Sequence, residues 1–196
     1  MALEYSQEDI FPARIGYTID KEFDYKDSLV EWILKYKEDN PSVKVSNIGG
    51  WQSRGNFYQE EESFRPFMDK IWKQISSTVD NYAEDLELRH LITNNHVLKL
   101  MNIWVNVNTP GSFNHVHVHP GSLLSGVLWV QYPEKSGHFI FRDPNTMNNY
   151  CLGLNVHEVV PTEGTMAIFP AFVPHNVDLN ESEGDRISIS FNLDID

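Results

Sequence analysis

Near the middle of the chain the sequence reads Asn114-His115-Val116-His117-Val118-His119-Pro120. If this stretch is an extended strand, side chains two residues apart point to the same face, so the three histidines share one face and the valines share the other. Neutral imidazole is the commonest metal ligand in proteins, and the pattern therefore predicts a metal site on the histidine face. The alternatives are a solvated polar face and a cluster of histidines joined by hydrogen bonds.

Only neighbouring histidines in such a strand can share one ion. His115 and His119 would lie roughly 13 Å apart along an extended chain, whereas a metal–nitrogen bond is about 2.1 Å long. His117 belongs to both of the remaining pairs and is the strongest candidate ligand. The spacing alone leaves open whether His115 or His119 is its partner, and a further ligand must come from elsewhere in the chain.

The second half of the chain alternates in the manner of β-strands. Residues 97–108 place Asn102, Trp104, Asn106 and Asn108 on one face of a predicted strand. Further strands are predicted at residues 125–132, 138–142, 155–160, 165–169 and 186–193, because turns rich in glycine and proline separate them. Short strands at this spacing predict a β-sandwich or barrel over residues 97–196.

In the first half of the chain, apolar residues recur mainly at helical spacing. Apolar residues at helical spacing predict helices at residues 27–37 and 63–84, and residues 11–19 predict a short strand. Between the helices, residues 47–55 form a glycine-rich loop around Trp51. We expect one domain of 196 residues, in which residues 1–96 support the β-rich part.

Composition excludes several classes of protein. The hydrophobic content of 41% is enough for a core, and no apolar run approaches the roughly 20 residues of a membrane-spanning helix. The net charge of −13 argues against general nucleic-acid binding, which needs a cationic surface. The single cysteine, Cys151, excludes an internal disulfide, and the first residues have no signal-peptide pattern, so we expect a cytoplasmic protein. The oligomeric state stays open, a homodimer included.

His175 is the best candidate for a ligand from elsewhere in the chain, because it follows the strand predicted at residues 165–169. The other histidines stand in weaker contexts: His90, His96, His138 and His157. Eleven residues after His175 comes Arg186, which shares one strand face with Ser188. An arginine binds a carboxylate through two hydrogen bonds, and a serine hydroxyl can add another. Together these residues predict a metal beside a dicarboxylate.

The order of these residues resembles a known family. His-x-His, Gly-x-x-x-x-Phe-Pro, a further histidine and Arg-x-Ser follow one another as in the iron- and 2-oxoglutarate-dependent oxygenases. The chain looks closest to a bacterial and phage branch with Asn-x-x-His-x-His-Pro before a Ser-Gly strand, here Asn114 to Val130. That branch also has a Gly-Trp-Gln-Ser element, here Gly50 to Ser53. The resemblance covers residues 11–192 and is strongest from Trp104.

The resemblance implies a double-stranded β-helix of about eight strands with flanking N-terminal helices. Prolyl hydroxylases have a glycine a few residues before their first ligand, as Gly111 stands before His117, and this register favours His119 as its partner. The implied ligands of Fe(II) are therefore His117, His119 and His175. The weaker candidates are Asn106 and Asn114 for cosubstrate contacts, and Trp51 and Trp104 for a substrate entrance, although packing suits both tryptophans better.

The resemblance also implies chemistry. Fe(II) would bind 2-oxoglutarate, whose far carboxylate Arg186 and Ser188 would hold, and an unidentified substrate would be hydroxylated with release of succinate and CO2. The chain departs from the family at His119, which stands where most members have an aspartate. With three neutral ligands the iron keeps its double positive charge, which 2-oxoglutarate would neutralise.

Two alternatives stay open at this point. One is a cupin-like dioxygenase with three histidine ligands and no 2-oxoglutarate, and the Arg186–Ser188 pair counts against it. The other is a metal-stabilised binding module without turnover.

Overall fold

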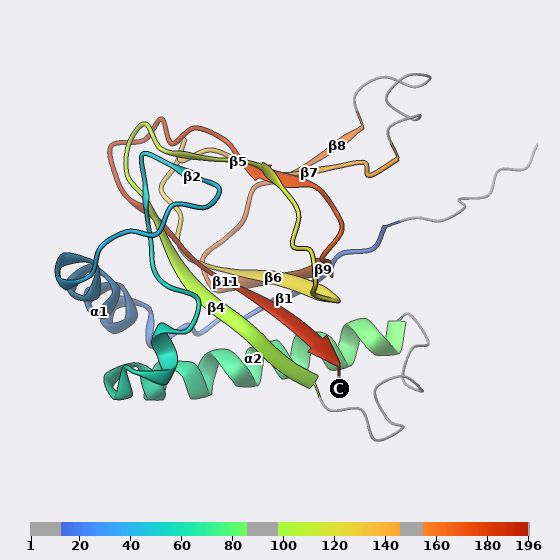
Figure 1. Ribbon diagram of the computed structural model, residues 1–196, viewed down its shortest axis with the longest axis horizontal. Helices are drawn as coiled ribbons and strands as arrows, with labels where there is room; N and C mark the ends of the chain where they lie inside the picture. Colours follow the sequence, from blue (N-terminus) through green and yellow to red (C-terminus); the bar gives the residue numbers. More distant parts are fainter. Residues whose placement is uncertain (1–12, 86–97, 146–154, 196) are drawn as a thin grey trace, which may run out of the picture.

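The computed structural model describes residues 13–85, 98–145 and 155–195. The helices in this part are α1 (Lys26–Asp39), η1 (Phe57–Gln59), η2 (Glu62–Phe64) and α2 (Arg65–Asp85). The strands are β1 (Gly16–Ile19), β2 (Asn47–Ile48), β3 (Trp51–Gln52), β4 (Leu98–Asn108), β5 (Phe113–His117), β6 (Leu124–Gln131), β7 (Phe139–Arg142), β8 (Val156–Val159), β9 (Thr165–Pro170), β10 (His175–Val177) and β11 (Arg186–Ile195). Figure 1 shows them as two facing sheets with α1 and α2 on one side.

The strands from β4 onwards pass back and forth between the two sheets. One sheet has the order β1-β9-β6-β11-β4-β3 and the other the order β2-β5-β10-β7-β8, and the neighbouring strands are antiparallel. The eight strands from β4 to β11 thus form a double-stranded β-helix, four in each sheet. This confirms the predicted fold class.

Helices cover the outer face of the six-stranded sheet because their apolar residues repeat at helical spacing. Leu29 and Ile33 of α1 and Ile71 and Ile75 of α2 are fully buried there. They pack against the outward side chains of the sheet: Ile103, Val105, Val107, Leu128, Val130, Ile187 and Ile189. Burying each such side chain stabilises the fold by roughly 1.5–3 kcal/mol. The opposite face of the sheet is left to line the space between the two sheets.

A second, smaller cluster of apolar side chains lies between the sheets. Its members are Val127, Trp129, Phe139, Phe141, Ala167, Phe169 and Val173. These residues come from strands of both sheets and from the turn after β9. Their packing fixes the separation of the two sheets, and the polar residues described below occupy the remaining interior.

The histidine strand differs from the prediction in a way that matters for the site. β5 ends at His117, so His119 lies in the following loop. The pairing with β10 steps by two residues from His175 to Val177 but by three from His117 to Asn114. This extra residue is a β-bulge, which reverses the facing of the side chains beyond it. The prediction that all three histidines share one face of a regular strand is therefore wrong.

Two shorter segments contain strands that the sequence did not predict. The glycine-rich loop contains β2, which pairs with β5, and β3, which pairs with β4, so it joins the two sheets at one edge. Gly50 is required there, because a Cβ atom would lie 2.9 Å from the carbonyl oxygen of Val107. His175, expected just beyond a strand, is the first residue of β10.

Other predicted elements lie within a few residues of those observed. Parts of the predictions fall outside the described residues: Phe11, Pro12, His90, His96, Val97 and Cys151. In the part of the chain that the structure describes, neither α-helix is both long and apolar enough to span a membrane.

Candidate active site

The three histidines His117, His119 and His175 meet between the two sheets. One ring nitrogen from each lies within 4.8 Å of those from the other two. The Nε2 atoms of His119 and His175 are 3.3 Å apart. Two nitrogens bound at right angles to one metal, each about 2.1 Å from it, would lie roughly 3 Å apart. The cluster therefore has the dimensions of a metal site.

Backbone carbonyls fix the orientation of two of these rings. Nδ1 of His117 lies 2.7 Å from the carbonyl oxygen of His115, and Nδ1 of His175 lies 2.9 Å from that of Val173. A carbonyl can only accept, so each Nδ1 carries the proton and donates it. Each Nε2 then keeps its lone pair and faces the cluster. Such a bond from the second nitrogen is the usual support of a metal-binding histidine.

Burial keeps all three imidazoles neutral. It lowers the pKa of His175 to about 3 and that of His119 to about 4, and the neighbouring histidines lower both further. Burial also lowers the pKa of His117, although its bond to the carbonyl of His115 acts in the opposite direction. Because only neutral imidazole binds a metal, the site is ready for one at neutral pH without releasing protons.

The other described histidines take no part in this cluster. His115 is exposed, and its ring packs edge-on against Phe113. His138 lies 3.1 Å from a carboxylate oxygen of Glu158 on the surface. His157 is exposed on β8. Of the two histidines that the spacing left open, His119 joins His117 and His175 in the cluster, whereas His115, beyond the bulge in β5, is exposed.

Arg186 lies in the same cavity and is only 3% exposed. Its Nη1 donates hydrogen bonds to the backbone carbonyls of Ser136, Gly137 and Asp178. Its Nη2 is buried and has no hydrogen-bond partner among the described residues. Burial lowers the pKa of Arg186 to about 10, so it stays protonated at neutral pH. A buried cation with one free donor group is fitted to bind an anion.

The turn that holds Arg186 requires a glycine. Gly137 has a φ of +89°, and a Cβ atom there would lie 2.4 Å from the carbonyl oxygen of Asp178. The hydroxyl of Tyr132 donates to the carbonyl of Gly137 at 2.6 Å. These contacts fix the carbonyl groups of Ser136, Gly137 and Asp178, here called the carbonyl cage, on one side of the guanidinium. The other side of the guanidinium faces the cavity.

Ser188 also lines the cavity. Its hydroxyl can donate a hydrogen bond and so add to the anion site beside Arg186. Antiparallel pairing places Asn106 opposite Ser188 and Asn108 opposite Arg186. The polar faces of β4 and β11 therefore form a continuous lining.

The two asparagines predicted to contact the cosubstrate differ in their partners. Asn106 is buried and donates through Nδ2 to Ser190 at 3.3 Å, while its Oδ1 has no partner among the described residues. Both ends of the Asn114 amide are already used, since Oδ1 accepts from Asn108 at 3.0 Å and Nδ2 donates to Ser46 at 3.3 Å. Asn114 thus ties β5 to its neighbours, whereas Asn106 has a free acceptor in the cavity.

The two tryptophans predicted near a substrate entrance lie in different environments. Trp104 is half-buried, lines the cavity and lies with its ring centroid 5.6 Å from that of His119. Trp51 lies in the core, where its Nε1 donates to the carbonyl of Asn40 at 2.8 Å and its ring packs against Tyr36. This placement favours packing for Trp51.

Several cavity residues were absent from the sequence-based set. They are Ser46, Asn108, Trp129, Phe139, Phe169 and Ser190. Asn108 and Ser190 could have been found, because strand alternation puts them on the faces of Asn106 and Ser188. Ser46 and the aromatic residues had no such signal, since they reach the cavity through the packing of distant segments.

Known proteins share part of this sequence and its fold. Residues 102–192 match the family described as "Putative 2OG-Fe(II) oxygenase". No curated protein matches the sequence. A prolyl-4-hydroxylase from Pseudomonas putida has a similar structure, with a TM-score of 0.58, 16% identity, and 91% of this chain and 92% of that chain covered.

Two further solved structures are similar. The viral collagen prolyl hydroxylase of Paramecium Bursaria Chlorella virus-1, in a 2-oxoglutarate complex, has a TM-score of 0.55 and 15% identity, and the match covers 91% of this chain and 94% of that one. HygX from Streptomyces hygroscopicus, with nickel, 2-oxoglutarate and hygromycin B bound, has a TM-score of 0.57 and 11% identity, covering 91% and 82%. The barrel of this chain, residues 102–192, thus matches a family of 2OG-Fe(II) oxygenases, and the chain has the fold of the three solved structures.

Proposed function

We propose that this protein is an Fe(II)- and 2-oxoglutarate-dependent dioxygenase that hydroxylates its substrate and releases succinate and CO2. The observation that carries the proposal is a buried arginine with a free Nη2 group in the same cavity as three neutral histidines. The histidines suit a metal and the arginine suits a carboxylate. A dicarboxylate that chelates the metal at one end fits both at once.

The ligands of Fe(II) in this proposal are the Nε2 atoms of His117, His119 and His175. These three residues would hold the ion and leave room for the cosubstrate beside it, as the two-histidine-one-carboxylate sites of non-haem oxygenases do. Here a third imidazole replaces the carboxylate. The site is therefore more positive by one charge, and a doubly negative cosubstrate neutralises it.

Arg186 and Ser188 hold the far carboxylate of 2-oxoglutarate. Nη2 of Arg186 is a donor without a partner among the described residues, the hydroxyl of Ser188 lines the same cavity, and a carboxylate supplies acceptors for both. Binding removes the cost of a buried unsatisfied donor, which is about 1–3 kcal/mol. Asn114 plays a supporting role, because its amide already links β4, β5 and the segment before β2.

Bound together, Fe(II) and 2-oxoglutarate supply oxidising chemistry in which one oxygen atom enters the substrate and the other enters succinate. The protein orients the two reactants and keeps water out. Aromatic side chains around His175, with Phe139 and Phe169 centred 5.2 Å and 4.9 Å from its ring, form the dry wall of the site. Exclusion of water strengthens the contacts of Arg186 with the carboxylate.

Two other functions fit fewer observations. A three-histidine dioxygenase without 2-oxoglutarate leaves the free donor of Arg186 unexplained. A structural metal site is closed on all sides by protein ligands, whereas the three histidines face a cavity. A metal-stabilised binding module does not explain this open side.

Oxygen consumption by the Fe(II)-loaded protein separates these functions. We expect slow consumption that requires 2-oxoglutarate and yields succinate in proportion. The His175→Ala variant is the matched control and should consume none. Oxygen consumption at the same rate with and without 2-oxoglutarate would favour the cupin-like enzyme. Iron binding without any oxygen consumption would favour the binding module.

A further inference from the structure

The cavity that holds the three histidines is almost free of charge. Apart from Arg186, its lining consists of imidazoles, amides, hydroxyls and apolar side chains. The segments that carry the histidines, residues 113–124 and 170–177, contain no Asp, Glu, Lys or Arg, although the chain has 15 basic and 28 acidic residues. Arg186 is already used by three carbonyls and, in the proposed function, by the cosubstrate.

This lining excludes a charged substrate group. An ion that leaves water for such a cavity loses several kcal/mol of hydration and needs a partner of opposite charge. The described lining offers no such partner once Arg186 is used. The part of the substrate that enters the cavity must therefore be uncharged.

Asn106 adds a requirement for a hydrogen-bond donor. Its side chain is held through Nδ2 by Ser190, and its Oδ1 is a buried acceptor without a partner among the described residues. Fe(II) and the 2-oxoglutarate dianion have no hydrogen atom to donate, so neither can satisfy Oδ1. Water can satisfy it, and a substrate that displaces this water must supply an O–H or N–H group of its own.

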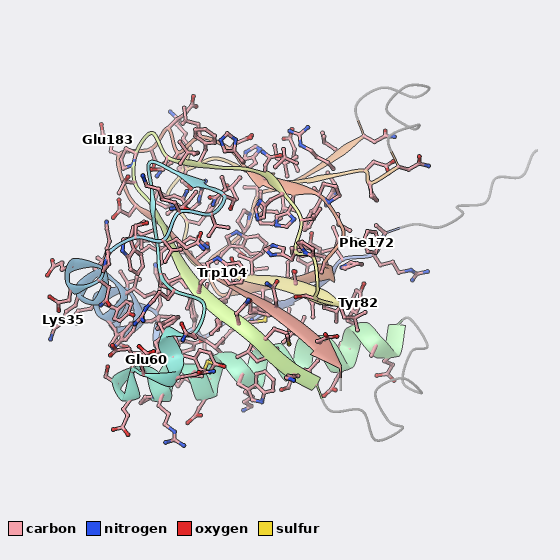
Figure 2. The ribbon with its side chains drawn as sticks, in the orientation of Figure 1. Lys35, Glu60, Tyr82, Trp104, Phe172 and Glu183 are labelled. Atoms are coloured by element: carbon pink, nitrogen blue, oxygen red, sulfur yellow. The ribbon has the colours of Figure 1, made fainter. Side chains whose placement is uncertain are left out.

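Asn106 stands opposite Ser188 of β11, between the Arg186 end of the cavity and Trp104. Along β4 it stands between Asn108, paired with Arg186, and Trp104, paired with Ser190. Figure 2 shows Trp104 between the two sheets, apart from Phe172, which lies in the loop from β9 to β10. The half-buried ring of Trp104 beside His119 offers an apolar surface next to the free acceptor. A molecule that meets both features has an apolar body and one donor group.

We propose that the part of the substrate that enters this site is an uncharged group with an apolar body and a hydroxyl or N–H group that donates to Oδ1 of Asn106. This inference rests on the proposed function, since the cosubstrate is what occupies Arg186.

Four probes of one size and shape test the proposal: cyclohexanol, methoxycyclohexane, cyclohexanecarboxylate and cyclohexylammonium. Their binding is measured by saturation-transfer NMR on the protein loaded with Zn(II) and 2-oxoglutarate, and Co(II) in place of Zn(II) reports proximity to the metal by broadening. We expect cyclohexanol to bind and to broaden. Methoxycyclohexane, which lacks the donor, should bind about fivefold more weakly, the factor of one hydrogen bond, and the charged probes should not bind.

Two variants locate the donor contact. Asn106→Leu should remove the preference for cyclohexanol. It should leave the affinity for 2-oxoglutarate within about twofold, because loss of a hydrogen bond to the cosubstrate would lower that affinity about fivefold. Asn102→Leu is the matched control, because its Oδ1 already accepts from Asn192 at 2.9 Å, and it should keep the preference.

The outcomes that overturn the proposal are distinct. Binding of a charged probe near the metal, equal binding of cyclohexanol and its methyl ether, or binding of none of the four would each contradict it. Loss of 2-oxoglutarate affinity in Asn106→Leu would make Asn106 a cosubstrate contact instead. Failure of the wild-type protein to bind 2-oxoglutarate, read from the cosubstrate's own signals in the same samples, would contradict the proposed function itself.

Discussion

At the scale of single residues, the candidate ligands differ in how their rings are held. Backbone carbonyls orient His117 and His175, whereas His115 contributes only its carbonyl and turns its own ring to solvent. We therefore expect His117→Ala and His175→Ala to lose tight metal binding, because each leaves two ligands. His115→Ala keeps the carbonyl and should bind metal nearly as the wild type does.

Metal content after gel filtration, measured by mass spectrometry, checks this expectation. Circular dichroism shows whether each variant is folded. Loss of iron from His115→Ala together with its retention in His119→Ala would mean that His115, and not His119, is the metal ligand.

Arg186 separates cosubstrate binding from metal binding. Arg186→Ala removes the donor that faces the cavity but none of the histidines, so iron should stay bound. The affinity for 2-oxoglutarate should fall by on the order of 2–5 kcal/mol, the cost of losing one member of a buried charged pair. Titration of the visible charge-transfer band of the Fe(II)–2-oxoglutarate complex under nitrogen gives the affinity. An unchanged affinity would make Arg186 purely structural.

At the scale of elements, neighbouring strands beside the site pack so closely that one position has no room for a side chain. A Cβ atom on Gly126 of β6 would lie 2.2 Å from Cζ of Phe191 and 2.8 Å from the carbonyl oxygen of Ala167. We expect Gly126→Ala to lower the free energy of unfolding by about 1–3 kcal/mol, because the core must be overpacked. Urea unfolding measures this.

Gly184→Ala is the matched control, since the nearest atom to its Cβ would be Cγ of Pro133 at 3.3 Å. It should change the free energy of unfolding by no more than about 0.5 kcal/mol. Equal effects of the two substitutions would mean that Phe191 moves aside at little cost.

The strands themselves could be predicted from the sequence, and one local irregularity could not. Alternation on β4 and β11 placed Asn106, Arg186 and Ser188 on faces that do line the cavity. The bulge in β5 had no signal, because nothing in Asn114 to His117 distinguishes a regular from a bulged strand. Strict alternation therefore joined His115 to His117, whereas the bulge turns Asn114 and His117 to the cavity.

At the scale of the whole molecule, the sequence predicted the double-stranded β-helix and its supporting helices, since periodicity of apolar residues decides both. It could not predict which segments of the first half meet the cavity. Ser46 reaches it because β2 pairs with β5, and this pairing depends on contacts between residues far apart in the chain. The carbonyl cage around Arg186 likewise appears only when the turn at Gly137 lies beside Asp178.

The buried histidines also make the stability of the metal-free protein depend on pH. The pKa values of His119 and His175 are about 4 and about 3, below the value of about 6.5 for an unfolded chain. Between these values the unfolded state binds more protons, so lowering the pH from about 6.5 towards 5 should destabilise the fold. Each histidine contributes at most about 1.4 kcal/mol per pH unit.

Urea unfolding of the metal-free protein at several pH values in this range gives the slope. His175→Asn, which has no titrating group at this position, should show a shallower slope than the wild type. Identical slopes would mean that the ring of His175 is accessible to protons in the folded protein.

The most direct test of the proposed site is a crystal structure of the protein soaked without oxygen in Fe(II) and 2-oxoglutarate, with the iron located by anomalous scattering. We predict one iron bound to Nε2 of His117, His119 and His175, chelated by the keto-acid end of 2-oxoglutarate. The far carboxylate should accept hydrogen bonds from Nη2 of Arg186 and the hydroxyl of Ser188. An iron bound elsewhere, or a cosubstrate whose far carboxylate avoids Arg186, would contradict the proposed function.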